Sequence, residues 1–198
     1  MSAKPVIVGV GGATRPNSST EKALRCALDA AAALGAETVL LGATDLQMPA
    51  YAPESPNRTP SALRLIAELR RADGIILASP GYHGGVSGLV KNALDYTEDM
   101  RGDERPYFDG RSVGCIVSAA GWQATTTTLV ALRGIVHALR GWPTPLGVCI
   151  NSTEPAFDTE GRCLSESLSQ QLDLLAAQTV WGAQAFIRPA GAVRRSVG

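Results

Sequence analysis

Five short apolar runs recur along the chain, and each run is continuous rather than alternating. They cover residues 6–10, 38–41, 74–78, 113–117 and 146–150. Strict alternation would indicate strands with one face in water, whereas a continuous β-branched run is typical of a strand buried on both faces. Strands are buried in this way where helices cover both sides of a parallel sheet. The runs therefore predict five strands of a parallel sheet.

Helical patterns lie between these runs, with apolar residues three or four positions apart. Four helices are marked in this way, by Leu24, Leu28 and Ala31; by Leu63, Ile66 and Leu69; by Leu129, Leu132, Val136 and Leu139; and by Leu164, Leu168, Leu172 and Leu175. A shorter helix is expected at residues 88–96. Strand and helix alternate five times, which predicts a doubly wound α/β fold. We assign residues 1–187 to a single domain and the patternless residues 188–198 to a flexible tail.

Composition and charge exclude several classes of protein. The 198 residues are 45% hydrophobic and 18% charged, which allows a sizeable core. Eighteen basic and eighteen acidic residues cancel, so bulk charge predicts no nucleic-acid or membrane partner. The apolar runs are too short to span a bilayer, and the N-terminus lacks the form of a signal peptide. These features favour a cytoplasmic protein.

Cysteine and histidine spacing indicates no metal site. The four cysteines include no CxxC pair, and we expect reduced thiols at Cys26, Cys115, Cys149 and Cys163. The two histidines are far apart in sequence, and His137 on the fourth predicted helix is expected to be structural. Since no cluster of His, Cys, Asp and Glu has ligand spacing, we predict no metal.

The segment GGATRPNSST, residues 11–20, follows the first strand and opens the first helix. It offers a helix N-terminus, whose unpaired N–H groups and partial positive charge bind anions. An alternative is that Ser18 only caps the helix, because Ser18 to Glu21 fit the S-x-x-E capping box. One cap needs neither four hydroxyls nor an arginine. We therefore predict a phosphate site built from Gly12, Thr14, Arg15, Ser18, Ser19 and Thr20.

The kind of phosphate follows from what this loop lacks. A P-loop needs Gly-Lys-Ser/Thr, but the first lysine, Lys22, already lies in the predicted helix. A dinucleotide fingerprint needs a third glycine where Thr14 stands. What remains is a terminal monophosphate held by hydroxyls and backbone amides.

Two further loops leave the carboxyl ends of predicted strands, where ligands bind in open α/β sheets. The loop SPGYHGG, residues 79–85, has glycines that would let the backbone approach a flat heterocycle, with the candidate contacts Pro80, Gly81, Tyr82, His83 and Gly84. Its alternative is a plain strand-to-helix connection. The loop SAAGWQAT, residues 118–125, contributes Ala120, Gly121 and Trp122. The Trp122 ring either faces the ligand or packs under a neighbouring helix.

At these residues the chain resembles the NAD(P)H-dependent FMN reductases of the flavodoxin-like class. That family's phosphate loop, Gly-Ser-x-Arg-x-x-Ser-x-Asn/Thr, is matched by Gly12, Arg15, Ser18 and Thr20, with Ala13 in place of the serine. Its second signature is matched by Ser79, Pro80, Tyr82, His83, Gly84, Gly88, Lys91, Asn92 and Asp95, with Gly81, Gly85 and Tyr96 as departures. Lys91 and Asp95, four positions apart, are expected to form an ion pair on one helix rather than to contact flavin.

The resemblance implies a flavodoxin-like five-stranded parallel sheet with helices on both faces, and FMN as the cofactor. It implies that the FMN phosphate lies on Arg15, Ser18 and Thr20, and the flavin ring against residues 80–84 near the third loop. NADPH or NADH would be the co-substrate, and a flavin, quinone, azo compound or similar small molecule the electron acceptor. Because the chemistry belongs to the cofactor, no catalytic side chain is nominated.

Other functions remain open from sequence alone. A flavodoxin-type electron carrier usually has an acidic docking surface, against which the balanced charge argues. A flavin-binding regulatory module would lack turnover with NAD(P)H. The resemblance further implies a homodimer or homotetramer. Aromatic residues and prolines on two long irregular connections favour the same conclusion: Pro49, Tyr51, Pro53, Tyr107 and Phe108.

Overall fold

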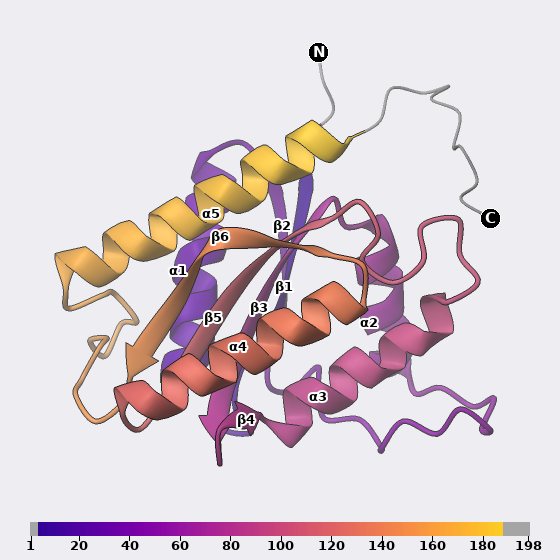
Figure 1. The fold of residues 1–198 in the computed structure, drawn as a ribbon, viewed down its shortest axis with the longest axis horizontal. Helices are drawn as coiled ribbons and strands as arrows, with labels where there is room; N and C mark the ends of the chain where they lie inside the picture. The colour runs from indigo at the N-terminus through magenta and orange to yellow at the C-terminus, as the bar shows by residue number, and fades with distance from the viewer. Residues whose placement is uncertain (1–3, 188–198) are drawn as a thin grey trace.

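A five-stranded parallel sheet forms the centre of the computed structural model, which describes residues 4–187 (Figure 1). The strands are β1 (Val6–Gly11), β2 (Glu37–Leu41), β3 (Gly74–Tyr82), β5 (Ser112–Ala119) and β6 (Trp142–Asn151). Their order is β2-β1-β3-β5-β6, the flavodoxin-like order, so the predicted fold class is confirmed. A two-residue strand, β4 (Gly85–Val86), pairs antiparallel with the end of β3.

Helices cover both faces of the sheet (Figure 1). On one face lie α1 (Ser19–Ala33) and α5 (Glu166–Phe186), and on the other lie α2 (Pro60–Arg71), α3 (Gly88–Asp95) and α4 (Trp122–Ala138). A short 3-10 helix, η1 (Tyr96–Met100), continues from α3. The helices begin where sequence places caps: the side chains of Ser18, Thr59, Ser87 and Ser165 each accept a backbone N–H of the first turn.

The two apolar layers explain why the strand runs are continuous. Ile7 and Ile76 belong to the layer under α1 and α5, whereas Val8, Ile75 and Leu77 belong to the layer under α2, α3 and α4. Neighbouring residues of one strand point to opposite faces. Each face is covered, so apolar residues continue without alternation through the middle of the central strands.

Two leucines of the predicted helical patterns lie elsewhere than expected. Leu63 is 58% exposed on α2, where the buried stripe runs through Leu65 and Leu69 instead. Leu164 is 59% exposed and precedes α5, because Ser165 caps that helix. The predicted loop at residues 79–85 is more regular than expected, since β3 continues to Tyr82 and turns into β4.

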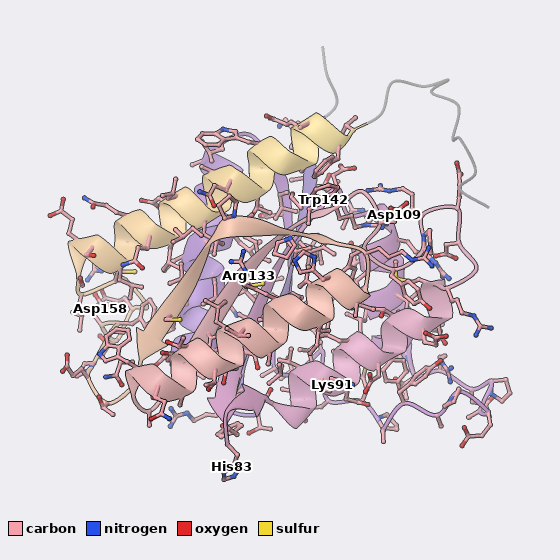
Figure 2. All side chains as sticks on the ribbon, viewed as in Figure 1. His83, Lys91, Asp109, Arg133, Trp142 and Asp158 are labelled. Atoms are coloured by element: carbon pink, nitrogen blue, oxygen red, sulfur yellow. The ribbon has the colours of Figure 1, made fainter. Side chains whose placement is uncertain are left out.

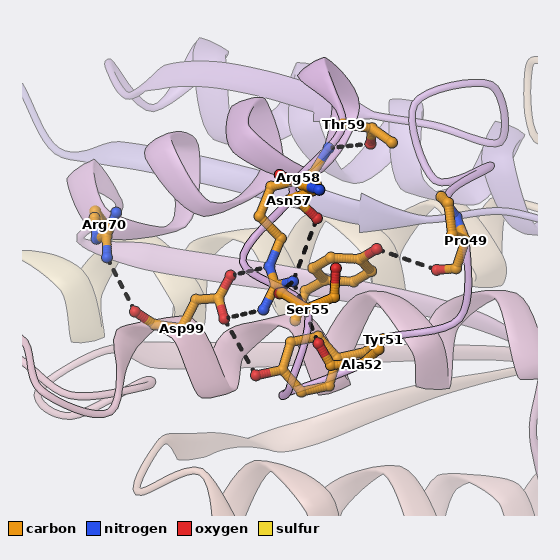
Figure 3. A network of polar contacts seen from close by, with 11 residues as sticks. Pro49, Tyr51, Ala52, Ser55, Asn57, Arg58, Thr59, Arg70 and Asp99 are labelled. Atoms are coloured by element: carbon orange, nitrogen blue, oxygen red, sulfur yellow. Dashed lines mark hydrogen bonds and ion pairs between the residues drawn. The ribbon is translucent and has the colours of Figure 1, made fainter.

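A network of polar contacts organises the irregular segment 45–59 (Figure 3). The Arg58 guanidinium donates to both Asp99 oxygens, at 2.6 and 2.9 Å, and to the Ser55 carbonyl at 2.5 Å. It lies 4.9 Å from the centre of the Tyr51 ring, and the Tyr51 hydroxyl donates to Asp99 at 3.1 Å. The segment is therefore fixed to η1.

The second irregular segment, 97–111, closes over the amino end of the sheet. Phe108 is fully buried in the core, and the Tyr107 hydroxyl donates to Glu98 at 3.0 Å. These rings, like that of Tyr51, are used inside the chain, so they do not by themselves indicate a partner. Across residues 4–187, no helix combines the length and apolarity needed to cross a membrane. The proposed tail, 188–198, lies outside the described residues.

Candidate functional site

The three candidate loops leave three adjacent strands at one edge of the sheet. The first follows β1, the second ends β3 and the third follows β5, and these strands are neighbours in the order β1-β3-β5. The chain reverses direction across the sheet between β1 and β3, which is the switch point where α/β sheets bind ligands. Residues far apart in sequence thus meet at this edge.

The first loop begins with a close approach of two backbones. Gly11, at φ +153, would place a β-carbon 2.0 Å from the Ala78 carbonyl oxygen, so no side chain fits there. The N–H of Gly12 donates to the same carbonyl at 3.1 Å. The loop is thereby anchored on the end of β3, and Gly12 itself is buried.

After Gly12, one side chain of the loop caps α1 and others are exposed to solvent. The Ser18 hydroxyl oxygen accepts the Glu21 N–H at 3.3 Å, as the capping alternative predicts, and its own O–H remains able to donate. Thr14 and Arg15 are exposed, and within residues 4–187 no hydrogen bond or ion pair engages the Arg15 guanidinium. The loop therefore offers hydroxyls, N–H groups and one unengaged cation.

Glu21 is the acidic residue nearest this loop, and its charge is paired. Its carboxylate is 6% exposed and accepts from the Arg25 guanidinium at 2.7 Å. A β-carbon at Gly12 would lie 3.6 Å from this carboxylate, and one at Gly42 3.4 Å away. The Glu21 carboxylate thus lies between the first loop and the segment after β2.

The second loop is a tight β-hairpin. Tyr82 pairs with Gly85, and the two residues between them, His83 and Gly84, have φ of +52 and +79. Two central residues with positive φ are the mark of a type I′ turn, which favours glycine at the second position. The turn accounts for Gly84 without reference to a ligand. Figure 2 shows His83 projecting from the tip.

Gly81 is required by packing rather than by its conformation. A β-carbon there would lie 2.5 Å from the Thr128 hydroxyl and 3.1 Å from the Ala119 β-carbon. The hairpin consequently lies directly against α4. At its base the Ser79 hydroxyl accepts the Ser87 N–H at 3.1 Å, which joins the hairpin to the start of α3.

The third loop opens α4 without a side-chain cap. Gly121 is the N-cap residue and has no side chain with which to satisfy the first turn, so N–H groups there remain available to a ligand. Its own N–H donates to the Asn151 side chain at 2.9 Å. Trp122 is 63% exposed, so the alternative in which it packs under a helix is wrong.

Gly84 of the second loop and the start of α4 border an open hollow of about 480 Å³, a volume within the range of small-ligand sites. Gly84, Ala120, Gly121, Trp122, Gln123, Ala124 and Thr127 line it. Sequence reasoning named the first four of these and missed the last three. These three residues could have been predicted from their position in the first turns of a helix that follows a buried strand. Asn151 was also missed, and the sequence indicates it only as a polar residue at the end of β6.

The other chemistry-bearing residues take no part in this hollow. The Lys91 ammonium lies 2.6 Å from the Asp95 carboxylate on α3, which confirms the expected i,i+4 ion pair. His137 is exposed in the last turn of α4. In the part of the chain that the structure describes, no group of three or more His, Cys, Asp and Glu could hold a metal ion.

Known proteins with similar sequences and folds were compared with this chain. Over 121 residues it is 32% identical to an NAD(P)H-dependent FMN reductase of Pseudomonas aeruginosa, covering 59% of this chain and 64% of the relative. Over 90 residues it is 34% identical to an FMN-dependent NADPH-azoreductase of Staphylococcus aureus, covering 46% and 44%. Each match thus spans less than two thirds of the curated relative.

Among solved structures, the fold is similar to FerB, a flavoenzyme NAD(P)H:(acceptor) oxidoreductase from Paracoccus denitrificans. The TM-score is 0.74 at 19% identity, over 92% of this chain and 98% of that one. This likeness supports the flavodoxin-like fold. The family model described as NADPH-dependent FMN reductase matches residues 5–154, which is most of the chain. The chain therefore belongs to the NADPH-dependent FMN reductase family.

Proposed function

We propose that this protein is an FMN reductase that takes a hydride from NADPH or NADH and passes the electrons to a flavin, quinone, azo compound or similar acceptor. The observation that carries the proposal is the convergence of two helix N-termini, those of α1 and α4, on the carboxyl edge of the sheet. One is preceded by the hydroxyl-rich loop and the other borders the hollow. The family match is consistent with this use of the site.

The first loop fits a terminal phosphate. The start of α1 offers N–H groups, the Ser18 hydroxyl retains its proton for donation, and the Arg15 side chain is exposed and unengaged within residues 4–187. Thr14, Ser19 and Thr20 supply further hydroxyls, while Gly12 lies buried at the base of the loop. The nearby Glu21 carboxylate is paired with Arg25, which limits its repulsion of a phosphate.

The hollow fits the flat end of the cofactor. Gly84 at the hairpin tip and residues 120–122 border it, and the Trp122 side chain is exposed there. N–H groups at the start of α4 can stabilise negative charge on a bound ring, since a helix N-terminus carries partial positive charge. FMN, when bound, supplies the hydride chemistry itself, so the protein provides orientation and charge stabilisation.

The proposal also includes an oligomeric state and a cellular location. We infer a homodimer or homotetramer, and the exposed Trp122, Trp142 and Trp181 side chains are candidates for burial between copies. We infer a cytoplasmic location, in keeping with the reduced cysteines that the sequence predicts. Sedimentation at micromolar concentration tests the first inference, and a species of monomer size alone would contradict it.

Turnover tests the proposed function directly. Purified protein is mixed with FMN and with NADPH or NADH, in the presence and absence of a quinone or azo acceptor, and the nicotinamide absorbance is followed. Acceptor-dependent loss of that absorbance is expected. Tight FMN binding without any turnover would instead favour the electron carrier or the regulatory module. Release of stoichiometric FAD on denaturation would overturn the choice of cofactor.

A further inference from the structure

Two cysteines that are separated by more than half of the chain lie against each other. Cys26 is on α1, and Cys163 lies in the connection from β6 to α5. The Cys26 thiol donates to the Gly161 carbonyl oxygen at 3.4 Å, two residues before Cys163, and each of the two thiols affects the pKa of the other. Both side chains are only partly buried, so a small reagent can reach them.

This contact is held by bonds that do not involve sulfur. The segment 157–163, which we name the β6–α5 hairpin, is closed by a bridge between Phe157 and Cys163. The Asp158 carboxylate accepts the Glu160 N–H at 2.9 Å and the Arg162 N–H at 2.9 Å. The hairpin is then fixed to α1, because the Lys22 ammonium donates to the Asp158 carbonyl at 2.8 Å. Figure 2 shows Asp158 in this connection.

The anchoring matters because a disulfide forms readily only where the chain already holds two thiols together. In a flexible chain, bringing two thiols together loses the conformational entropy of the loop between them. In the folded protein the other contacts of the hairpin already hold the loop closed. Lys22 and Cys26 are one helical turn apart on α1 and both contact the hairpin. The pair is therefore positioned by the fold.

We propose that Cys26 and Cys163 form a site of reversible oxidation, at which a hydroperoxide converts the two thiols into a disulfide that joins α1 to the β6–α5 hairpin. One sulfur attacks a peroxide oxygen, the O–O bond breaks, and a sulfenic acid and water form. The second sulfur attacks the first, the S–O bond breaks, and a second water leaves. Overall, two thiols and one H₂O₂ give one disulfide and two waters, and a thiol reductant reverses the reaction.

The order of attack follows from the environment of each sulfur. Burial is the main cause that raises the pKa of Cys26 to about 12, with the Cys163 sulfur and the Asp29 carboxylate adding to it. Burial also raises the pKa of Cys163, and Asp173 on α5 acts in the same direction, but the neighbouring Cys26 thiol opposes them. Cys163 is therefore the first nucleophile. Little thiolate exists at neutral pH, so the reaction is slow and accelerates as pH rises.

The other two cysteines provide an internal comparison. Cys115 is 1% exposed in the core, and Cys149 faces the Thr125 hydroxyl. They lie on adjacent strands but not opposite each other, because Cys115 pairs with Gly147 and Cys149 with Val117. Peroxide should therefore act at the Cys26 site in preference to this pair. The proposal does not depend on the proposed flavin chemistry.

Peptide mapping tests the site in the intact chain. The protein is treated with hydrogen peroxide, quenched, alkylated and digested with trypsin, which separates all four cysteines because Arg25 and Arg162 directly precede the proposed pair. We expect one cross-linked species that joins the peptides beginning at Cys26 and Cys163, and loss of two of the four free thiols. Both changes reverse with dithiothreitol.

Matched variants and stability complete the test. Cys26→Ser and Cys163→Ser should each abolish the cross-link, whereas Cys149→Ser should leave it intact. The oxidised wild type should melt at least about 5 °C higher, because the disulfide closes a long loop in the unfolded chain. The initial rate should rise several-fold between about pH 7 and pH 8. A preferred cross-link through Cys115 or Cys149, a bond between two chains, or oxidation of single cysteines to sulfinic acid would overturn the proposal.

Discussion

An irregular segment at each end of the parallel strands carries an arginine, and one arginine is exposed whereas the other is buried. Arg15, after β1 at the carboxyl edge, is exposed and has no partner within residues 4–187. Arg111, before β5 at the amino edge, is 1% exposed and donates to the Ala72, Arg70 and Tyr107 carbonyls, each at 3.0 Å. Burial lowers the pKa of Arg111 to about 10.

The contrast separates a structural charge from one available to a ligand. A buried guanidinium must be hydrogen-bonded, because an unpaired buried charge is strongly destabilising. Arg111 meets that requirement with hydrogen bonds to backbone oxygens and so ties the end of α2 to the segment 97–111. Arg15 makes no such contribution to the fold. Its side chain is free to meet an anion, and the expected effects of substitution therefore differ in kind.

The largest effect is expected from Arg111→Ala. It removes a buried side chain and leaves several carbonyl groups without donors, which should lower the free energy of unfolding by about 3–5 kcal/mol. FMN affinity of the folded protein should stay within about twofold. Chemical denaturation with flavin titration measures both, and Arg101→Ala, at a side chain 76% exposed, is the control. A stability loss under about 1 kcal/mol would remove the contrast between the two arginines.

Arg15→Ala should weaken FMN binding and leave the stability of the protein unchanged, the reverse of what is expected for Arg111→Ala. A charge-assisted hydrogen bond to phosphate is typically worth about 1.5–3 kcal/mol, so FMN binding should weaken roughly tenfold to a hundredfold. The melting temperature without flavin should not change. Flavin fluorescence titration gives the dissociation constant, again with Arg101→Ala as the control. An unaltered dissociation constant would remove Arg15 from the phosphate site.

Gly84→Val tests whether the hairpin tip serves the flavin or only the turn. Valine strongly disfavours φ of +79, and the strain of about 1–3 kcal/mol should displace the tip and lower both FMN occupancy and turnover roughly tenfold. Gly88→Ala is the control, because a β-carbon there meets nothing within 4 Å. Tyr82→Ala should be milder, since it only removes an exposed ring. If Gly84→Val keeps full affinity and turnover, the hairpin is only a connector.

The smallest effect concerns the network of Figure 3 and its dependence on pH. The Arg58 guanidinium, and then the Tyr51 hydroxyl, hold the pKa of Asp99 below its usual value of 3.8. Asp99 thus stabilises the folded state above about pH 4, and this contribution is lost as pH falls through the folded pKa. Asp99→Asn should cost about 1 kcal/mol at pH 7 and progressively less below pH 4. An equal cost at every pH would show that the carboxylate charge is irrelevant.

The elements of this fold, and the loops at the carboxyl end of its sheet, can be predicted from the amino-acid sequence. Continuous apolar runs place the strands, and the serine and threonine caps begin the helices. These signals are local: the strand period and the cap hydrogen bonds depend on residues a few positions apart. The three loops could be assigned to one edge because successive parallel strands place their carboxyl ends together.

Features that depend on residues far apart in the chain could be recognised only in the folded molecule. Gly81 is explained by Thr128 on α4, Arg111 by carbonyls at the end of α2, and the hollow by the fit of the β3–β4 hairpin against the start of α4. The contact of Cys26 with Cys163 is of the same kind. No local pattern encodes such pairs, because they arise when crossovers bring separate elements together and packing then selects the residues that fit.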